Sequence, residues 1–282
     1  MLEEKTISLP SPLYDKKATY YYYPDCKAKA VILYFHGGGL LYGRRTDLPM
    51  MHLFRLTSAG YPVLSFDYPL APAVHMDEIF ADVCDSVKWY IDHPEETCEE
   101  PLPYFLWGRS AGAYLALLAA AWGEFPLEPS GIISFYGYGF LTDRWYNEPS
   151  PYYKTLPAVP PECLEAIPQG IHAEGDLDSH YSVYVYARQT GLWKDLIYEG
   201  REKYFYLRYS LRLCDKLPAP LFAVHCTGDP DVPFTEFREI VTRYAPERFI
   251  VMQDVHDFDR NEMDPVTQTA IGRMITFCHS KL

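Results

Sequence analysis

The stretch of sequence that decides the fold is Tyr104-Phe-Leu-Trp-Gly-Arg-Ser-Ala-Gly-Ala-Tyr-Leu-Ala-Leu-Leu-Ala-Ala-Ala-Trp122. Its first four residues are apolar and typical of a buried strand, whereas residues 111–122 have the composition of a helix packed on a sheet. The two parts are joined by the turn Gly108-Arg109-Ser110-Ala111-Gly112. Such a turn projects a serine from the carboxyl end of its strand, and the flanking glycines let the strand and helix backbones approach. The stretch therefore predicts a nucleophile, Ser110.

Strands and helices alternate on both sides of this turn. Further strands are predicted at residues 17–23, 29–35, 62–68, 131–137, 221–226 and 249–255. Apolar side chains at helical spacing predict a helix over residues 77–91. This alternation indicates an α/β fold with a largely parallel, doubly wound sheet. Residues 17–23 are expected to form an outer strand.

The alternation breaks between residues 138 and 218, a span that is rich in Tyr and Trp. It is too long for an ordinary connection between a strand and a helix. We expect residues 1–137 and 219–282 to form the core, with 138–218 as a mostly helical cap folded over it. The many tyrosines suit the partly wet roof of a substrate pocket. The alternative is a pair of sheet-covering helices joined by long loops.

A glycine run, His36-Gly37-Gly38-Gly39, directly follows the strand predicted to end at residue 35. Glycines let adjacent backbone N–H groups point at one spot, where they can stabilise the oxyanion of an acyl-transfer reaction. The run lacks the Lys-Ser/Thr ending and the spaced glycines of nucleotide-binding loops. His36 is expected to shape this loop rather than to act as a base.

These stretches resemble the α/β-hydrolase superfamily, and within it the HGGG-type esterase/lipase group related to hormone-sensitive lipase. The matching stretches are residues 34–39, 67–72, 108–112, 229–233 and 255–258. The resemblance implies ester hydrolysis on an eight-stranded, mostly parallel sheet. It also implies that the N–H groups of Gly38, Gly39 and Ala111 form the oxyanion hole, with Gly37 and Gly38 as the alternative pair.

The chain departs from this group in one respect. Its glycine loop begins at residue 36, which leaves little room for the N-terminal helical cap of many such esterases. The cap is instead expected after the sixth strand. The substrate preferences of the N-terminally capped enzymes are therefore not expected to hold for this chain.

The resemblance also suggests how the triad is completed, in the chain order Ser, acid, His. Asp229 matches the acid position of the family, and Asp231 is its competitor. His256, just past the last predicted strand, matches the catalytic histidine. His279 also follows the acid but is expected to be exposed in the terminal helix, and His225 precedes the acid inside a strand.

These residue types imply a two-step reaction. The histidine takes the serine proton and returns it to the leaving alkoxide, and the aspartate orients the imidazole. Water then hydrolyses the acyl-enzyme, with the same histidine as base.

Several charged residues have weaker claims. Asp82 matches an acidic family position and is expected to be structural. Arg109 could contact an acidic group of the substrate or pack behind the turn. Arg44 and Arg45 could guide an anionic substrate or simply be solvated.

The overall composition argues against several other classes of protein. A net charge of -13 disfavours binding to nucleic acid or to anionic lipid. No apolar run reaches the roughly 20 residues that span a bilayer. No signal peptide, cofactor motif or metal-ligand spacing is recognised, and the 7 cysteines contain no C-x-x-C pair.

The sequence thus predicts a cytoplasmic carboxylesterase that acts on small or medium acyl esters, without a cofactor or metal. A homodimer is a further expectation, because the cap would expose tyrosines. An amidase related to acyl-peptidases and prolyl oligopeptidases is one alternative, although no propeller repeat is present. The other is a ligand receptor or scaffold that keeps the fold with little turnover.

Overall fold

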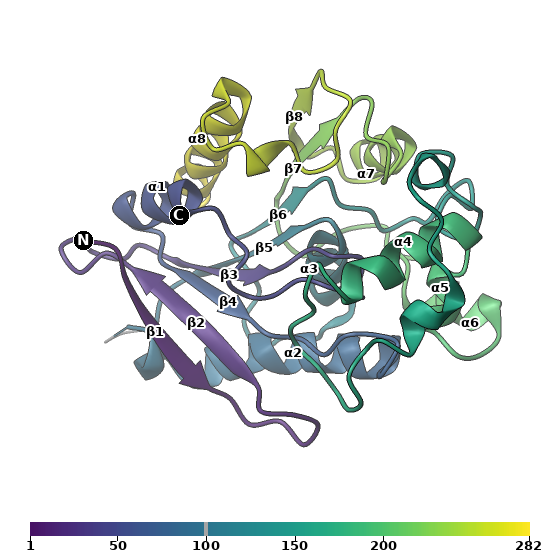
Figure 1. The fold of residues 1–282 in the computed structure, drawn as a ribbon. Coiled ribbons are helices and arrows are strands. Elements are labelled where there is room, and N and C mark those ends of the chain that lie inside the picture. Colours follow the sequence, from purple (N-terminus) through teal and green to yellow (C-terminus); the bar gives the residue numbers. More distant parts are fainter. Residues whose placement is uncertain (99–100) are drawn as a thin grey trace.

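A single twisted sheet forms the centre of the molecule in the computed structural model, which describes residues 1–98 and 101–282 (Figure 1). The sheet has eight strands in the order β1-β2-β4-β3-β5-β6-β7-β8. The strands are β1 (Glu3–Ser8), β2 (Lys17–Tyr22), β3 (Val31–Phe35), β4 (Val63–Phe66), β5 (Tyr104–Arg109), β6 (Gly131–Phe135), β7 (Leu221–Cys226) and β8 (Glu247–Val251). The pairs β1–β2 and β2–β4 are antiparallel, and all other pairs are parallel.

Helices cover both faces of this sheet (Figure 1). The α-helices are α1 (Met50–Ser58), α2 (Met76–Asp92), α3 (Ala111–Trp122), α4 (His180–Thr190), α5 (Trp193–Ile197), α6 (Glu202–Arg208), α7 (Phe234–Tyr244) and α8 (Pro265–Ser280). Short 3₁₀ helices lie at Pro94–Glu96, Tyr153–Thr155, Pro161–Leu164 and Phe258–Arg260. None of the helices within the described ranges combines the length and the apolarity needed to cross a membrane.

The apolar strands explain why both faces need cover. In β3, Val31, Leu33 and Phe35 point to the core shared with α2 and α3. The alternate residues Ile32 and Tyr34 point to the opposite core, which α1 and α8 close. A strand that is buried on both faces is apolar throughout, as the sequence of β3 is.

The expected eight-stranded, mostly parallel α/β sheet is confirmed, with differences at its two edges. Residues 17–22 form the second strand rather than the outer one, because Glu3–Ser8 pairs beyond them. This first strand went unpredicted since its side chains are mostly polar and exposed. The last strand spans Glu247–Val251 and not residues 249–255, since it begins on two charged residues that are exposed at the sheet edge.

The segment between β6 and β7 carries α4, α5 and α6, which lie together beyond the carboxyl ends of the central strands (Figure 1). These helices are short, with 11, 5 and 7 residues, so loops and turns make up more of residues 138–218 than the sequence suggested. Many of its aromatic side chains are buried in packing against the core rather than exposed, among them Tyr138, Tyr146, Tyr184, Trp193, Phe205 and Tyr209.

Candidate active site

Four loops meet at the carboxyl edge of the parallel strands. They follow β3, β5, β7 and β8, and carry Gly37, Ser110, Asp229 and His256 respectively. The register brings the first two loops together, because Phe35 of β3 is paired with Gly108 of β5. Residues far apart in sequence therefore share one site, as is usual at the carboxyl ends of strands in open α/β sheets.

Ser110 lies on a sharp turn between β5 and α3. Its φ of 54° is positive, a conformation that costs a non-glycine residue about 1–3 kcal/mol. The flanking glycines are sterically required: a Cβ at Gly108 would lie 2.1 Å from the Gly112 backbone, and one at Gly112 would lie 2.0 Å from the Phe35 carbonyl oxygen. The glycines of the motif thus permit the close packing that holds the strained serine.

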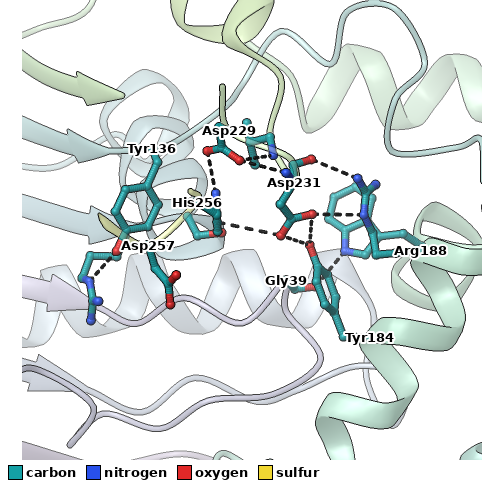
Figure 2. A network of polar contacts seen from close by, with 12 residues as sticks. Gly39, Tyr136, Tyr184, Arg188, Asp229, Asp231, His256 and Asp257 are labelled. Atoms are coloured by element: carbon teal, nitrogen blue, oxygen red, sulfur yellow. Dashed lines mark hydrogen bonds and ion pairs between the residues drawn. The ribbon is translucent and has the colours of Figure 1, made fainter. Parts of the chain in front are cut away.

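Ser110, His256 and Asp229 form a continuous hydrogen-bonded chain. The Ser110 Oγ lies 2.8 Å from His256 Nε2. On the other side of the ring, His256 Nδ1 lies 2.7 Å from Asp229 Oδ2 (Figure 2). A bond from Nδ1 to a carboxylate leaves Nε2 free to accept the serine proton. The three residues are arranged for nucleophilic catalysis.

The two competing carboxylates lie on different sides of the imidazole (Figure 2). The second oxygen of Asp229 accepts hydrogen bonds from the backbone N–H groups of Asp231 and Val232, at 2.8 and 2.9 Å. Asp231 instead has an oxygen 3.9 Å from His256 Nε2, the nitrogen that faces the serine. The geometry therefore favours Asp229 as the residue that orients the ring.

The carboxylates also set the charge state of His256. Burial lowers the pKa of this imidazole, but Asp229, with smaller effects of Asp231 and Asp257, outweighs burial and raises the pKa from 6.5 to about 9. Burial raises the pKa of Asp229, but His256 and His225 outweigh burial and hold it well below its usual value. The aspartate is thus ionised wherever the imidazole can act as a base.

The glycine loop lies beside the nucleophile. A Cβ at Gly37 would be 3.3 Å from the Ser110 Cβ, and both Gly38 and Gly39 have positive φ, at 106° and 59°. Within residues 1–98 and 101–282, the N–H groups of Gly38, Gly39 and Ala111 donate no hydrogen bond. These amides have the backbone freedom and the unused donors that an oxyanion hole needs.

His36 supports this loop from beneath and does not reach the nucleophile. Its ring is fully buried and stacks on Tyr68 with 4.1 Å between ring centroids. Its Nδ1 donates to the Gly37 carbonyl at 2.7 Å, and the Tyr68 hydroxyl donates to the His36 carbonyl at 2.9 Å. Burial lowers the pKa of His36.

Arg109 packs behind the turn, one of the two arrangements considered from sequence. Its Nε donates to the Tyr136 hydroxyl at 2.7 Å and its Nη2 to Asp259 Oδ1 at 3.0 Å. Asp259 is fully buried and also lies 3.0 Å from His52. Because Asp259 follows His256 closely in sequence, this buried cluster ties the histidine loop to the serine turn.

The structure brings in residues that sequence reasoning missed. His225 in β7 was set aside as a base, yet its Nε2 lies 3.3 Å from Asp229 Oδ2, on the core side of the acid. Tyr136 packs edge-on to His256, with 4.7 Å between ring centroids. From residues 138–218, Tyr184 and Trp193 contact the glycine loop. Only His225 had a local signal, since it lies four residues before Asp229.

The other candidate residues lie outside this cluster. Asp82 forms a buried ion pair with Lys16, 2.8 Å apart, which suits the structural role expected for it. Arg45 pairs with Asp67 at 2.8 Å, and Arg44 lies 3.6 Å from Asp176 at the surface. His279 is exposed. No group of three or more His, Cys, Asp or Glu side chains in the described part of the chain could hold a metal ion.

A small pocket adjoins the glycine loop. Its volume is about 220 Å³, below the roughly 300–1,000 Å³ of pockets for drug-sized ligands. It is lined by Gly37, Gly38, Tyr42, Arg44, Leu177 and Arg260, among others. The lining includes Gly37 and Gly38 of the glycine loop, which lies beside the nucleophile, but not Ser110, Asp229 or His256 themselves.

Comparisons with known proteins agree with this architecture. Residues 32–203 match the model of a family described as the alpha/beta hydrolase fold. A solved structure of an alpha/beta hydrolase superfamily protein from Enterococcus faecalis superposes with a TM-score of 0.82 and 27% sequence identity, over 98% of each chain.

Curated relatives match parts of the chain. It is 31% identical over 120 residues to an acetyl esterase from Salmonella schwarzengrund, which covers 42% of this chain and 36% of that protein. It is also 30% identical over 171 residues to a non-reducing polyketide synthase from Penicillium roqueforti, covering 53% of this chain and 6% of the synthase. The chain thus matches well under half the length of these two relatives.

Proposed function

Because this chain belongs to the alpha/beta hydrolase fold family, we propose that it is a serine esterase with Ser110, His256 and Asp229 as its catalytic triad. The observation that carries the proposal is the continuous chain from Ser110 Oγ to His256 Nε2, at 2.8 Å, and from His256 Nδ1 to Asp229, at 2.7 Å. The partial match to an acetyl esterase supports ester hydrolysis.

The first half of the reaction forms an acyl-enzyme. Ser110 Oγ attacks the carbonyl carbon of the ester while His256 Nε2 takes the hydroxyl proton. The carbonyl oxygen becomes an oxyanion, which the free N–H groups of the glycine loop and of Ala111 are placed to stabilise. The bond to the alkoxy oxygen then breaks, and His256 gives its proton to the leaving alcohol.

The second half restores the serine. A water molecule attacks the acyl carbon as His256 takes one of its protons, and the bond to Ser110 Oγ breaks as His256 returns that proton to the serine. The carboxylic acid is released. Throughout, Asp229 holds Nδ1–H and stabilises the imidazolium that forms.

We propose small or medium acyl esters as substrates, since the pocket beside Gly37 is only about 220 Å³ in volume. Residues 138–218 would serve as the cap over this site, because Tyr184 and Trp193 reach the glycine loop from α4 and α5. A cytoplasmic location and a homodimer stay predictions from the sequence.

A substrate panel tests the proposal. We expect hydrolysis of p-nitrophenyl acetate and butyrate, a much lower rate for the decanoate, and little cleavage of p-nitroacetanilide. Ser110→Ala should reduce kcat by on the order of 10⁶, as in serine protease triads. Faster anilide cleavage would indicate the amidase alternative, and no turnover of any substrate would favour the receptor or scaffold.

A further inference from the structure

Two helices of the segment between β6 and β7 contact the catalytic loops directly. Tyr184 and Arg188 project from α4 and Trp193 from α5, and all three side chains are buried. They meet the glycine loop at Gly39 and the acid loop at Asp231 (Figure 2). The Gly39 amide is one of the proposed oxyanion donors, and Asp231 lies beside the imidazole of His256.

At Gly39, two aromatic side chains fix the backbone. The indole Nε1 of Trp193 donates to the Gly39 carbonyl oxygen at 2.8 Å. The ring of Tyr184 packs so closely that a Cβ at Gly39 would lie 2.1 Å from a ring carbon. Since Gly39 has a φ of +59°, a conformation that glycine leaves easily, these contacts restrain a residue that could otherwise turn its amide away.

At Asp231, the same helix holds a carboxylate beside the imidazole. The Tyr184 hydroxyl donates to both carboxylate oxygens, each at 2.8 Å, and Arg188 Nε lies 3.2 Å from Oδ1. Arg188 also donates from Nη2 to the Asp231 backbone carbonyl at 2.9 Å. One carboxylate oxygen is then 3.9 Å from His256 Nε2, close but beyond hydrogen-bond distance.

We propose that these side chains are positioning residues of the active site. Trp193 and the ring of Tyr184 hold Gly39 in the conformation in which its amide faces the oxyanion. The hydroxyl of Tyr184, with Arg188 behind it, keeps Asp231 from pairing directly with the Nε2–H of the imidazolium, so that Nε2 stays directed at Ser110. The inference rests on the proposed esterase function and deepens it, because the inserted segment becomes part of the catalytic apparatus.

Trp193→Phe tests the Gly39 contact. The loss of the indole donor should lower kcat for p-nitrophenyl acetate by between about 10-fold and 100-fold, with little change in KM. The inhibition constant of a trifluoromethyl ketone, whose adduct mimics the oxyanion, should weaken by a similar factor. The pH midpoint of kcat/KM should stay where it is in the wild type.

Tyr184→Phe tests the Asp231 contact, since phenylalanine keeps the ring against Gly39. The charged groups that face the His256 imidazole are Asp229, Asp231 and Asp257. Freed from the tyrosine hydroxyl, Asp231 should stabilise the imidazolium further and move the pH midpoint upward by on the order of 0.5–1 pH unit. In an Asp231→Asn background the same tyrosine change should leave the midpoint unmoved.

Matched controls lose the same kind of bond away from the site. Tyr104→Phe removes a hydroxyl bond to the Leu127 carbonyl (2.6 Å) at the amino end of β5. Trp122→Phe removes an indole bond to the Ser210 carbonyl (3.3 Å) at the far end of α3. Thermal melting of each variant separates a folding defect from an effect on the site.

The outcomes separate this inference from the function on which it rests. If the wild type shows Ser110-dependent turnover but Trp193→Phe and Tyr184→Phe match the control variants in kcat, inhibitor affinity and pH midpoint, the inference alone is overturned. If the wild type shows no Ser110-dependent turnover, the esterase function fails and the inference fails with it.

Discussion

The two sides of the His256 ring are built by different parts of the chain. On the Nδ1 side, Asp229 is fixed by backbone N–H groups of its own turn, two and three residues on. On the Nε2 side, Asp231 is held by side chains of α4, from 43 and 47 residues away. Two carboxylates separated by one residue are therefore oriented differently, Asp229 by its own turn and Asp231 by side chains that are distant in sequence.

One loop thus places two carboxylates on different sides of the same imidazole, and each is held in a different way. A carboxylate that accepts hydrogen bonds from its own turn, as Asp229 does, is oriented without contacts from another segment of the chain. One that is held by a separate segment depends on how that segment packs. We therefore expect Asp229 to act as the constant partner of the imidazole and Asp231 to respond to the inserted segment.

Of the changes to the two sides of the His256 ring, Asp229→Asn should reduce the catalytic rate most. An amide cannot stabilise the imidazolium and favours the wrong tautomer, so kcat should fall by about 10⁴, as in serine proteases. Steady-state kinetics with p-nitrophenyl acetate measures this loss. Asp231→Asn is the paired variant, and a greater loss from it than from Asp229→Asn would reverse the assignment of the acid.

The buried cluster of Arg109, Tyr136 and Asp259 behind the serine turn should affect stability more than the rate of hydrolysis. Arg109→Met leaves Asp259 buried without its cationic partner, which should lower the free energy of unfolding by about 3 kcal/mol. Urea denaturation measures the change. A variant as stable as the wild type would show that the Arg109–Asp259 pair does not hold the serine turn and the histidine loop together.

Asp231→Asn should have a smaller effect than these, mainly on the pH profile. The negative charge near Nε2 favours the imidazolium, and only the neutral imidazole is a base. Its removal should therefore lower the pKa of His256 and move the rise of kcat/KM to lower pH by about 0.5–1 unit. In the wild type, kcat/KM should rise with pH through a midpoint near 9. A midpoint that moves upward in the variant contradicts this account.

Asp257→Asn should give the smallest effect. Asp257 favours the imidazolium too but follows Asp229 and Asp231 in its influence on the pKa of His256. The variant should shift the midpoint downward by about 0.3 pH unit, with the plateau rate unchanged. An equal or larger shift than in Asp231→Asn would mean that the Nε2 side carries less charge than the structure indicates.

Much of the fold and of the site could be predicted where the signal is local. The serine turn combines an apolar strand, two glycines that sterics require and an alanine-rich helix, all within residues 104–122. Seven of the eight strands in the sheet had apolar runs that predicted them. The first strand did not, because its side chains are mostly exposed and only pairing with β2 reveals it.

The rest depends on contacts that no local pattern records. Nothing near Tyr184 indicates that its hydroxyl meets Asp231, and nothing near Asp259 indicates Arg109, 150 residues earlier. Of the eleven tyrosines in residues 138–218, which the sequence assigned to a wet pocket roof, six are buried, because aromatic rings pack the inserted segment onto the sheet domain. Chain connectivity alone could not distinguish these arrangements.

The most direct test of the account is covalent labelling of the nucleophile. The protein would be treated with a fluorophosphonate probe, and the adduct would be counted by intact mass and located by peptide mapping. We predict one adduct per chain on Ser110, no adduct in Ser110→Ala and much slower labelling in His256→Ala. An unlabelled wild type, or equal labelling of Ser110→Ala, would contradict the assignment of Ser110 as an activated nucleophile.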